Sequence, residues 1–544
     1  MSGSSGKGAS AETLRGIRPS DAVLCEKCRK SRAQSVARQG RKLCAECLVS
    51  AIAKKVSAES RMGGLVGHGD RLVAGLSGGA GSSAMLEVLK SFQSVVVDRP
   101  ERGKVVYDLV GVHVDEAGAH GASGAGGARD IPPHARRAVE AVQALHGGPR
   151  VRLAVVRLEW ALSAELLDRA RAPSADGPSD ADVAALEREP PQELTERLLQ
   201  LLGAVRDETG REDLIAALRG HLLATVCRVL RCNKLALGES ATRMAINALC
   251  DSAKGRGYSM TANTRWCDAR LSALGLGPTV VRPMQEVTSR ELCQYGRHHG
   301  LPNAPPYRSL QKRPFVSSSI NSIVENFLGD MQDILPSSAS TVLKTCSKLM
   351  AFQFNEVRAA APAVMDVGHR SAPHGMQVRQ EREQAKRAAA SSAGIASSVD
   401  DTDGPPLPCA ICTGPLSPHE VQQGAARARA ADDGAHGDAS ARDLFDAAGC
   451  DSCREQILDL PVYLQPRAQT RAQGADPAPF MPPGMLELAR AVRTALAVRS
   501  GASAAGADPV CEEREAGAAE PALRRMEREE MRAALEGWLL EDQA

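Results

Sequence analysis

The stretch that decides the fold is RLVAGLSGGAGSS, residues 71–83, in which a short apolar run leads into a glycine-rich turn. Residues 71–76 have the composition of a buried strand, and residues 83–92 place their apolar side chains on one face of a helix. A glycine turn between a strand and a helix N-terminus suits a phosphate, because backbone N–H groups and the helix dipole both favour an anion there. The residues assigned to this nucleotide loop are Ser77, Gly78, Gly79, Ser82 and Ser83.

Two common nucleotide motifs are excluded by the spacing of this loop. No Gly-Lys-Ser/Thr follows, as a Walker A loop requires, and the G-x-G-x-x-G pattern of dinucleotide-binding proteins is missing. A glycine turn that binds no ligand remains the alternative interpretation, and the residues of the loop leave both readings open.

Further apolar runs alternate with helix-like stretches over residues 61–360. The runs that read as short buried strands are 108–115, 151–158, 234–237 and 279–282. Alternating strands and helices predict βαβ units and therefore an α/β fold with a parallel sheet. Two insertions, 117–130 and 170–192, are expected to be surface loops or disorder because Gly, Ala, Pro, Asp and Ser dominate them.

Four C-x-x-C pairs account for eight of the 15 cysteines. In the first module Cys25-x-x-Cys28 is followed by Cys44-x-x-Cys47, a spacing typical of zinc ribbons. Four thiolates complete a tetrahedral shell, so a structural zinc ion is predicted there, with a redox or sulfur-carrying C-x-x-C as the alternative. Basic residues surround these ligands: Lys27, Arg29, Lys30, Arg32, Arg38, Arg41 and Lys42.

A zinc knuckle with a basic rim is suited to RNA, although such a charge bias also fits an ordinary solvated face. The second module contains Cys409, Cys412, Cys450 and Cys453, with a low-complexity stretch, 422–442, between the pairs. That stretch is expected to loop out at modest entropic cost, so a second structural zinc site is predicted, with unligated thiols as the alternative.

The pattern along the chain predicts six parts. They are a flexible tail (1–20), the first zinc module (21–60), the α/β domain (61–365), a linker (366–405), the second zinc module (406–464) and a tail with two short amphipathic helices (465–544). The start of the sequence lacks an apolar signal segment, and no run approaches the length of a membrane span. An intracellular protein without a membrane partner is therefore expected, and its thiols should stay reduced.

The nucleotide loop resembles the PP-loop, S-G-G-x-D-S, of ATP pyrophosphatases that adenylate their substrates. Gly81 stands where that family has Asp, and residues 238–243 read GESATR where the family has G-H-N-x-D-D. Carboxylates at those places would help to hold magnesium and the departing pyrophosphate. The resemblance therefore implies the PP-loop (adenine nucleotide alpha hydrolase-like) fold without the acidic groups that catalysis needs.

Taken together, several stretches resemble the cytoplasmic tRNA 2-thiolation protein 2 family over nearly the whole chain apart from the insertions. They are the first zinc module before the loop, the loop itself at 76–79, and the segments 112–116, 234–240, 282–284 leading to 291–292, 315–349, the second cysteine module and 538–542. The family forms a heterodimer with a paralogous subunit that keeps an intact PP-loop. The pair adds sulfur to the wobble uridine (U34) of tRNA Lys, Glu and Gln in the cytoplasm.

The resemblance further implies that the sulfur comes from a thiocarboxylated ubiquitin-related modifier and that ATP is bound productively by the partner. This chain is then expected to be a tRNA-binding scaffold rather than a catalyst. Two alternatives are an active ATP-dependent tRNA sulfurtransferase and a zinc protein with an unrelated interaction role. The cysteines outside the modules are expected to be small buried apolar residues, namely Cys227, Cys232, Cys250, Cys267, Cys293 and Cys346, with Cys511 incidental.

Overall fold

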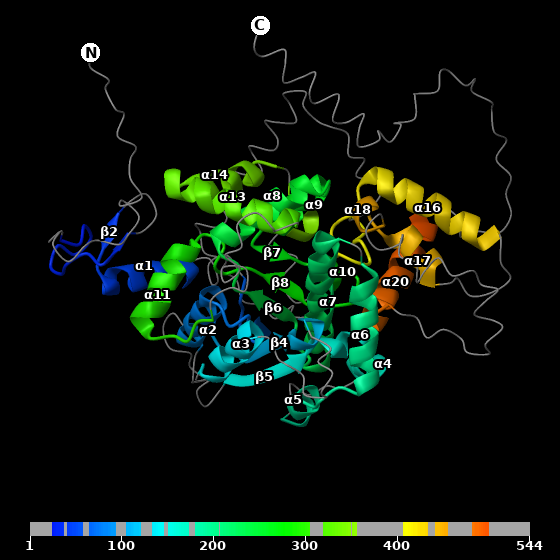
Figure 1. The fold of residues 1–544 in the computed structure, drawn as a ribbon, viewed down its shortest axis with the longest axis horizontal. Helices are drawn as coiled ribbons and strands as arrows, with labels where there is room; N and C mark the ends of the chain where they lie inside the picture. Colours follow the sequence, from blue (N-terminus) through cyan, green and yellow to red (C-terminus); the bar gives the residue numbers. More distant parts are fainter. Residues whose placement is uncertain are drawn as a thin grey trace, which may run out of the picture. The chain divides into compact units, whose positions relative to one another are not determined.

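A six-stranded sheet lies at the centre of the protein (Figure 1). The computed structural model describes residues 24–36, 41–57, 65–93, 105–120, 133–145, 151–172, 180–205, 207–304, 319–349, 351–355, 406–433, 441–454 and 481–499. The strands of this sheet are β3 (Arg71–Gly75), β4 (Asp108–Asp115), β5 (Val151–Arg157), β6 (Lys234–Leu237), β7 (Cys267–Asp268) and β8 (Thr279–Val281).

The order of the strands is β5-β4-β3-β6-β8-β7, and every neighbouring pair is parallel except β7 with β8. This confirms the predicted α/β class, and five of the strands lie where the apolar runs placed them. The chain leaves β3 toward β4 on one side and returns to β6 on the other. The switch point of the sheet, where the strand order reverses, therefore lies between β3 and β6. Open α/β sheets bind ligands at such a point, outside the carboxyl ends of their strands.

Both faces of the sheet are covered, which explains why its strands are nearly continuous apolar runs. Val73 of β3 belongs to one apolar core, whereas its neighbours Leu72 and Ala74 belong to a second core on the other face. The first face carries α4 (Ala164–Arg171), α5 (Asp180–Leu186), α6 (Gln192–Ala204) and α7 (Glu208–Val229). The second face carries α1 (Ala45–Ser57), α2 (Ala80–Phe92), α3 (Pro133–Gln143) and α11 (Ser289–His299).

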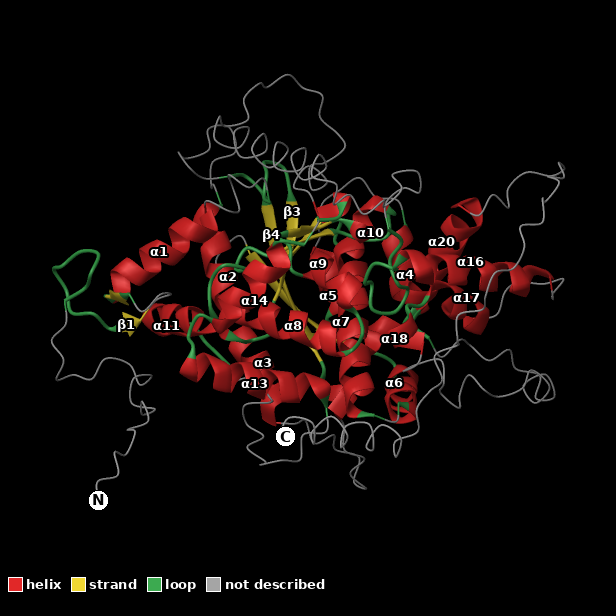
Figure 2. Cartoon of the chain, turned by 90° about the horizontal axis from the view of Figure 1, so that it is seen from above, coloured by secondary structure: helices red, strands yellow, loops and turns green. Residues whose placement is uncertain are grey.

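A third group of helices packs around α8 (Ala241–Ala253), which follows β6. Its members are α9 (Gly257–Asn263), α13 (Ile320–Ile334) and α14 (Ser338–Ser347), whereas the short helix α10 (Arg270–Ala273) contacts β8. A small core unites α8, α13 and α14, with Ile246, Leu328 and Ala339 buried in it. Figures 1 and 2 both show α13 and α14 beside α8.

The first cysteine module consists of β1 (Ser35–Val36), β2 (Lys42–Leu43) and α1, and it packs against α2 and α11. The second module consists of α16 (Pro418–Asp433), α17 (Ala441–Ala448) and α18 (Asp451–Cys453). It packs with α20 (Pro483–Arg499), a helix within the predicted tail 465–544, and its apolar residues join the first core of the sheet. The other predicted tail helix, the tail 1–20 and the linker 366–405 lie outside the described residues.

Two loop predictions were wrong in part. Residues 422–433 form most of α16 instead of looping out, because alanine favours a helix and small side chains such as Ala425 and Ala428 allow close packing. Residues 180–186 form α5, which packs on β5. Two short 3-10 turns, Ala117–His120 and Leu158–Leu162, follow β4 and β5, and a third covers Gln353–Asn355. Among the described residues, no helix is long and apolar enough to span a membrane.

Candidate functional site

The glycine loop follows β3 directly and leads into α2, at the switch point of the sheet. Gly78 has a φ of 75°, in the left-handed region that favours glycine. A Cβ at Gly78 would lie 2.9 Å from the carbonyl oxygen of Ala138 in α3, so a side chain would not fit either. The Gly78 carbonyl accepts a 2.8 Å hydrogen bond from the N–H of Ala304. The loop is therefore held between α3 and residues 301–304.

Serine side chains of the loop bond to the loop itself. The N–H of Ser77 donates to Ser82 Oγ at 3.1 Å, and Ser82 Oγ donates to the Gly79 carbonyl at 3.0 Å. The N–H of Gly79 donates to Ser77 Oγ at 3.4 Å. Ser83 Oγ donates to the carbonyl of Pro302 at 3.2 Å. The structure thus brings the predicted loop residues together, but two N–H groups that a phosphate would use already have partners.

The position of the missing Asp is closed by the backbone of β6. A Cβ at Gly81 would collide with the carbonyl oxygen of Gly238, and a Cβ at Gly238 would lie 2.6 Å from Ser82 Cα. The two glycines therefore let α2 and the end of β6 approach each other directly. In this conformation an aspartate at position 81 has no room, so the departure from the PP-loop pattern also has a packing reason.

The residues that replace the second acidic motif stabilise the fold. Glu239 pairs with Arg282 at 2.7 Å, and Ser240 caps α8 by accepting the N–H of Arg243 at 3.1 Å. Arg243 also pairs with Glu325 of α13 at 3.0 Å. Each of these groups is engaged in capping or ion pairing, and none supplies the carboxylate pair that magnesium would need.

At the ends of β4 and β5, sequence reasoning missed a buried ionic cluster. His113 is buried and its Nδ1 lies 2.7 Å from the carbonyl oxygen of Leu76, and burial lowers the pKa of this imidazole. Arg157 pairs with Glu159, which is fully buried, at 3.0 Å and lies 3.7 Å from Asp115. The only signal in the sequence was that charged residues directly follow two apolar strands. These groups anchor the strand ends beside the loop.

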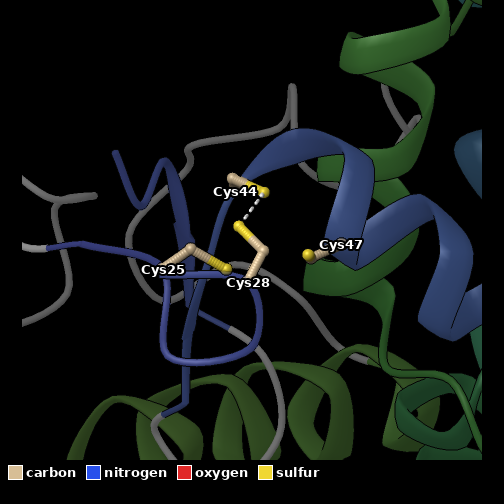
Figure 3. A group of neighbouring side chains, drawn as sticks. All are labelled: Cys25, Cys28, Cys44 and Cys47. Atoms are coloured by element: carbon tan, nitrogen blue, oxygen red, sulfur yellow. Dashed lines mark hydrogen bonds between the residues drawn. The ribbon is translucent and has the colours of Figure 1, made fainter. Parts of the chain in front are cut away.

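The first four cysteines converge as predicted (Figure 3). Their Sγ atoms all lie within 4.8 Å of one another, and those of Cys28 and Cys44 are 3.8 Å apart. Four convergent thiols on two turns fit a tetrahedral metal ion. Most of the basic rim is exposed, namely Lys27, Arg29, Lys30, Arg32 and Arg41, whereas Lys42 is half-buried and Arg38 lies outside the described residues.

The second four cysteines also converge within 4.8 Å, and this cluster is more deeply embedded. Cys409 Sγ accepts the N–H groups of Ile411 at 3.4 Å and Cys450 at 3.3 Å. The guanidinium of Arg256 lies 3.8 Å from Cys453 Sγ and pairs with Asp213 at 2.8 Å. Such contacts favour thiolates, so this cluster can hold a metal ion as well.

Five of the six other cysteines within the described residues are buried as predicted: Cys227, Cys232, Cys250, Cys267 and Cys346. The prediction for Cys293 was wrong, because this residue is exposed on α11. The sequence could have shown this, because the helical period places Leu292 and Tyr295 on the buried face of α11 and Cys293 outside that face. Cys293 lines a pocket of about 310 Å³ with Ala80 and Arg297, and partial burial of its sulfur raises the pKa of the thiol.

Comparison with known proteins gives a consistent set of relatives, although no family model matches the chain. Over 358 residues it is 27% identical to cytoplasmic tRNA 2-thiolation protein 2-B of Xenopus laevis, covering 60% of this chain and 68% of that protein. It is 28% identical over 371 residues to the human cytoplasmic tRNA 2-thiolation protein 2, covering 61% and 68%. A solved structure, the U34-tRNA thiolase NcsA of Methanococcus maripaludis with its 4Fe–4S cluster, aligns with a TM-score of 0.37 and 14% identity, covering 64% of this chain and 93% of that one.

Proposed function

Because the chain belongs to the cytoplasmic tRNA 2-thiolation protein 2 family, we propose that it is an accessory subunit of a cytoplasmic complex that thiolates tRNA. The complex would act on the wobble uridine of tRNA Lys, Glu and Gln, with sulfur from a thiocarboxylated ubiquitin-related modifier. A paralogous subunit with an intact PP-loop would bind ATP productively and carry out the chemistry. This chain would contribute tRNA-binding surface and hold that subunit.

The direct approach of Gly81 to Gly238 is the observation that carries the non-catalytic role. It fills the place from which a carboxylate would have to reach magnesium. The hydrogen bonds of Ser77 and Ser82 add to this, because a phosphate would have to break them to reach the backbone donors of the loop. Binding of ATP would therefore break hydrogen bonds within the loop. Position 81 would offer no carboxylate to coordinate the magnesium ion of the nucleotide.

Zinc is the metal proposed for both cysteine clusters. Four thiolates without an open position are typical of structural zinc, which stabilises small modules that lack a core of their own. In the first module the metal would fix the turns that carry Lys27, Arg29 and Arg32, so that their charges form one surface. That surface would bind tRNA phosphates and release counterions.

The experiment that tests the catalytic assignment uses the purified full chain with both metals bound. Incubated alone with ATP and tRNA, it should form neither AMP and pyrophosphate nor thiolated uridine. Formation of either by the isolated chain, at a rate matching that of the reconstituted complex, would instead establish the alternative of an active sulfurtransferase.

A second experiment tests the tRNA surface. Replacing Arg29 and Arg32 by Gln should weaken tRNA binding and lower the slope of log K against log salt by about 2. The matched control replaces Arg429 of α16 and Arg490 of α20 by Gln, which are also exposed arginines but lie outside the first module. Metal content should stay unchanged in both variants. Equal tRNA affinity and salt slope in the two variants would contradict a binding role of the first module.

A further inference from the structure

Helix α13 carries a row of large apolar side chains that no described residue covers. Ile323 is 57% exposed, Phe327 56% and Ile334 77%, and Leu335 directly after the helix is 54% exposed. Spacings of four and seven residues put the three helical side chains on one face. We call these four residues the α13 stripe. Most of the exposed large apolar residues within the described part of the chain belong to it.

The opposite side of α13 fixes the helix to the protein. Leu328 is buried against α8 and α14, and Glu325 pairs with Arg243 of α8 at 3.0 Å. Ser319 caps the helix by accepting the N–H of Ser322 at 3.1 Å. The α13 stripe is therefore presented by a well-anchored helix. A face of exposed large apolar side chains on such an element marks an interaction site.

The charges around the stripe select its partner. Asp330 is exposed on the same face, between Phe327 and Ile334, Asp333 is exposed beside the stripe, and α13 contains no Lys or Arg. Phosphates of RNA and anionic lipid headgroups would be repelled by these carboxylates. A second copy of the chain would bring Asp330 close to its own counterpart across a two-fold axis near the middle of the stripe. What fits is a protein surface that is apolar at its centre and bordered by Lys or Arg.

We propose that the α13 stripe is the surface through which this chain binds its partner subunit, and that the partner offers an apolar patch edged with basic residues. This rests on the proposed function, which supplies a paralogous catalytic subunit as that partner. Because α8 starts at the end of β6, α13 lies on the group of helices next to the switch point of the sheet. The basic rim belongs to different elements, so the same molecule can bind tRNA and the partner at once.

The test measures the affinity of the full, metal-loaded chain for the purified paralogous subunit from the same source, by calorimetry. Replacing Ile323 by Asn together with Phe327 by Ser should weaken binding at least tenfold. Replacing Asp330 and Asp333 by Lys should also weaken it at least fivefold, with a smaller difference at high salt. Leu349→Ser is the matched control, since Leu349 is 40% exposed outside the stripe and outside both cysteine modules, and it should bind like the wild type.

Thermal unfolding and tRNA binding of each variant show whether it is folded, and both should match the wild type. The inference is overturned if the wild type binds the subunit and both stripe variants bind it equally well, a result that leaves the proposed function standing. It is also overturned if the stripe variants lose tRNA binding or self-association instead of subunit binding. Failure of the wild type to bind the subunit at all would remove the proposed function, and the inference with it.

Discussion

Restoring the aspartate of the PP-loop pattern should damage this protein rather than activate it. In Gly81→Asp the new Cβ would meet the carbonyl oxygen of Gly238, with Leu292 Cδ1 at 3.7 Å on another side. The backbone at Gly238 cannot easily retreat, since it is itself pressed against Ser82. Crowding of this kind costs about 1–3 kcal/mol. A carboxylate facing a carbonyl oxygen without a donor adds about 1–3 kcal/mol more.

The expected loss in the free energy of unfolding is therefore about 2–5 kcal/mol after allowance for the partial exposure of this position. For a domain of this size each kcal/mol lowers Tm by about 2–4 °C, so a decrease of about 10 °C is expected. Gly81→Ala isolates the steric part and should cost about 1–3 kcal/mol. Gly220→Asp in α7 is the control, because nothing lies within 4 Å of a Cβ there and the change should stay within about 0.5 kcal/mol.

The assay is thermal and urea unfolding of the metal-loaded chain, followed by measurement of AMP and pyrophosphate release with tRNA. The packing argument is refuted if Gly81→Asp unfolds within about 0.5 kcal/mol of the wild type. Release of AMP by this variant would refute the stronger statement that the site cannot be repaired by one substitution.

Three further predictions concern the buried polar groups and the metals. Arg256→Gln should lower the free energy of unfolding in urea by about 2 kcal/mol, because the Cys453 thiolate loses a charged donor while Asp213 keeps its ion pair with Lys254 at 2.9 Å. A loss below about 0.5 kcal/mol would contradict this. Burial holds the pKa of His113 below its unfolded value of about 6.5, so the unfolded chain binds more protons than the folded chain. The free energy of unfolding should therefore fall as the pH decreases from about 7 to 5, and His113→Asn should make this decrease smaller. An unchanged pH dependence in the variant would show that His113 is not its source. Cys25→Ser and Cys409→Ser should each remove one of the two proposed metal ions, as measured by native mass spectrometry. The decrease in Tm should be larger for Cys409→Ser, because its cysteine cluster is part of the core of the sheet. Retention of both ions in either variant would exclude the metal site proposed for the cysteine that was replaced.

The sequence by itself determined the elements and the ligand sets whose signals are local. A buried parallel strand is a contiguous apolar run, so 108–115 and 234–237 could be bounded to the residue. A C-x-x-C turn brings two thiols together through its own backbone, and so the convergence of each group of four cysteines could be predicted from a pair of such turns. The glycine turn likewise located the loop between its strand and the following helix.

Tertiary structure decided everything that depends on which distant segments meet. Only packing shows that Gly81 touches Gly238 and that residues 422–433 have helices to pack on. The position of the loop could be predicted from the sequence. The hydrogen bond from the Ser77 N–H to Ser82 Oγ could not, because the partner of a hydroxyl depends on the local three-dimensional geometry. Periodicity and spacing are properties of neighbours along the chain, whereas close approach is set by the summed packing of elements far apart in it.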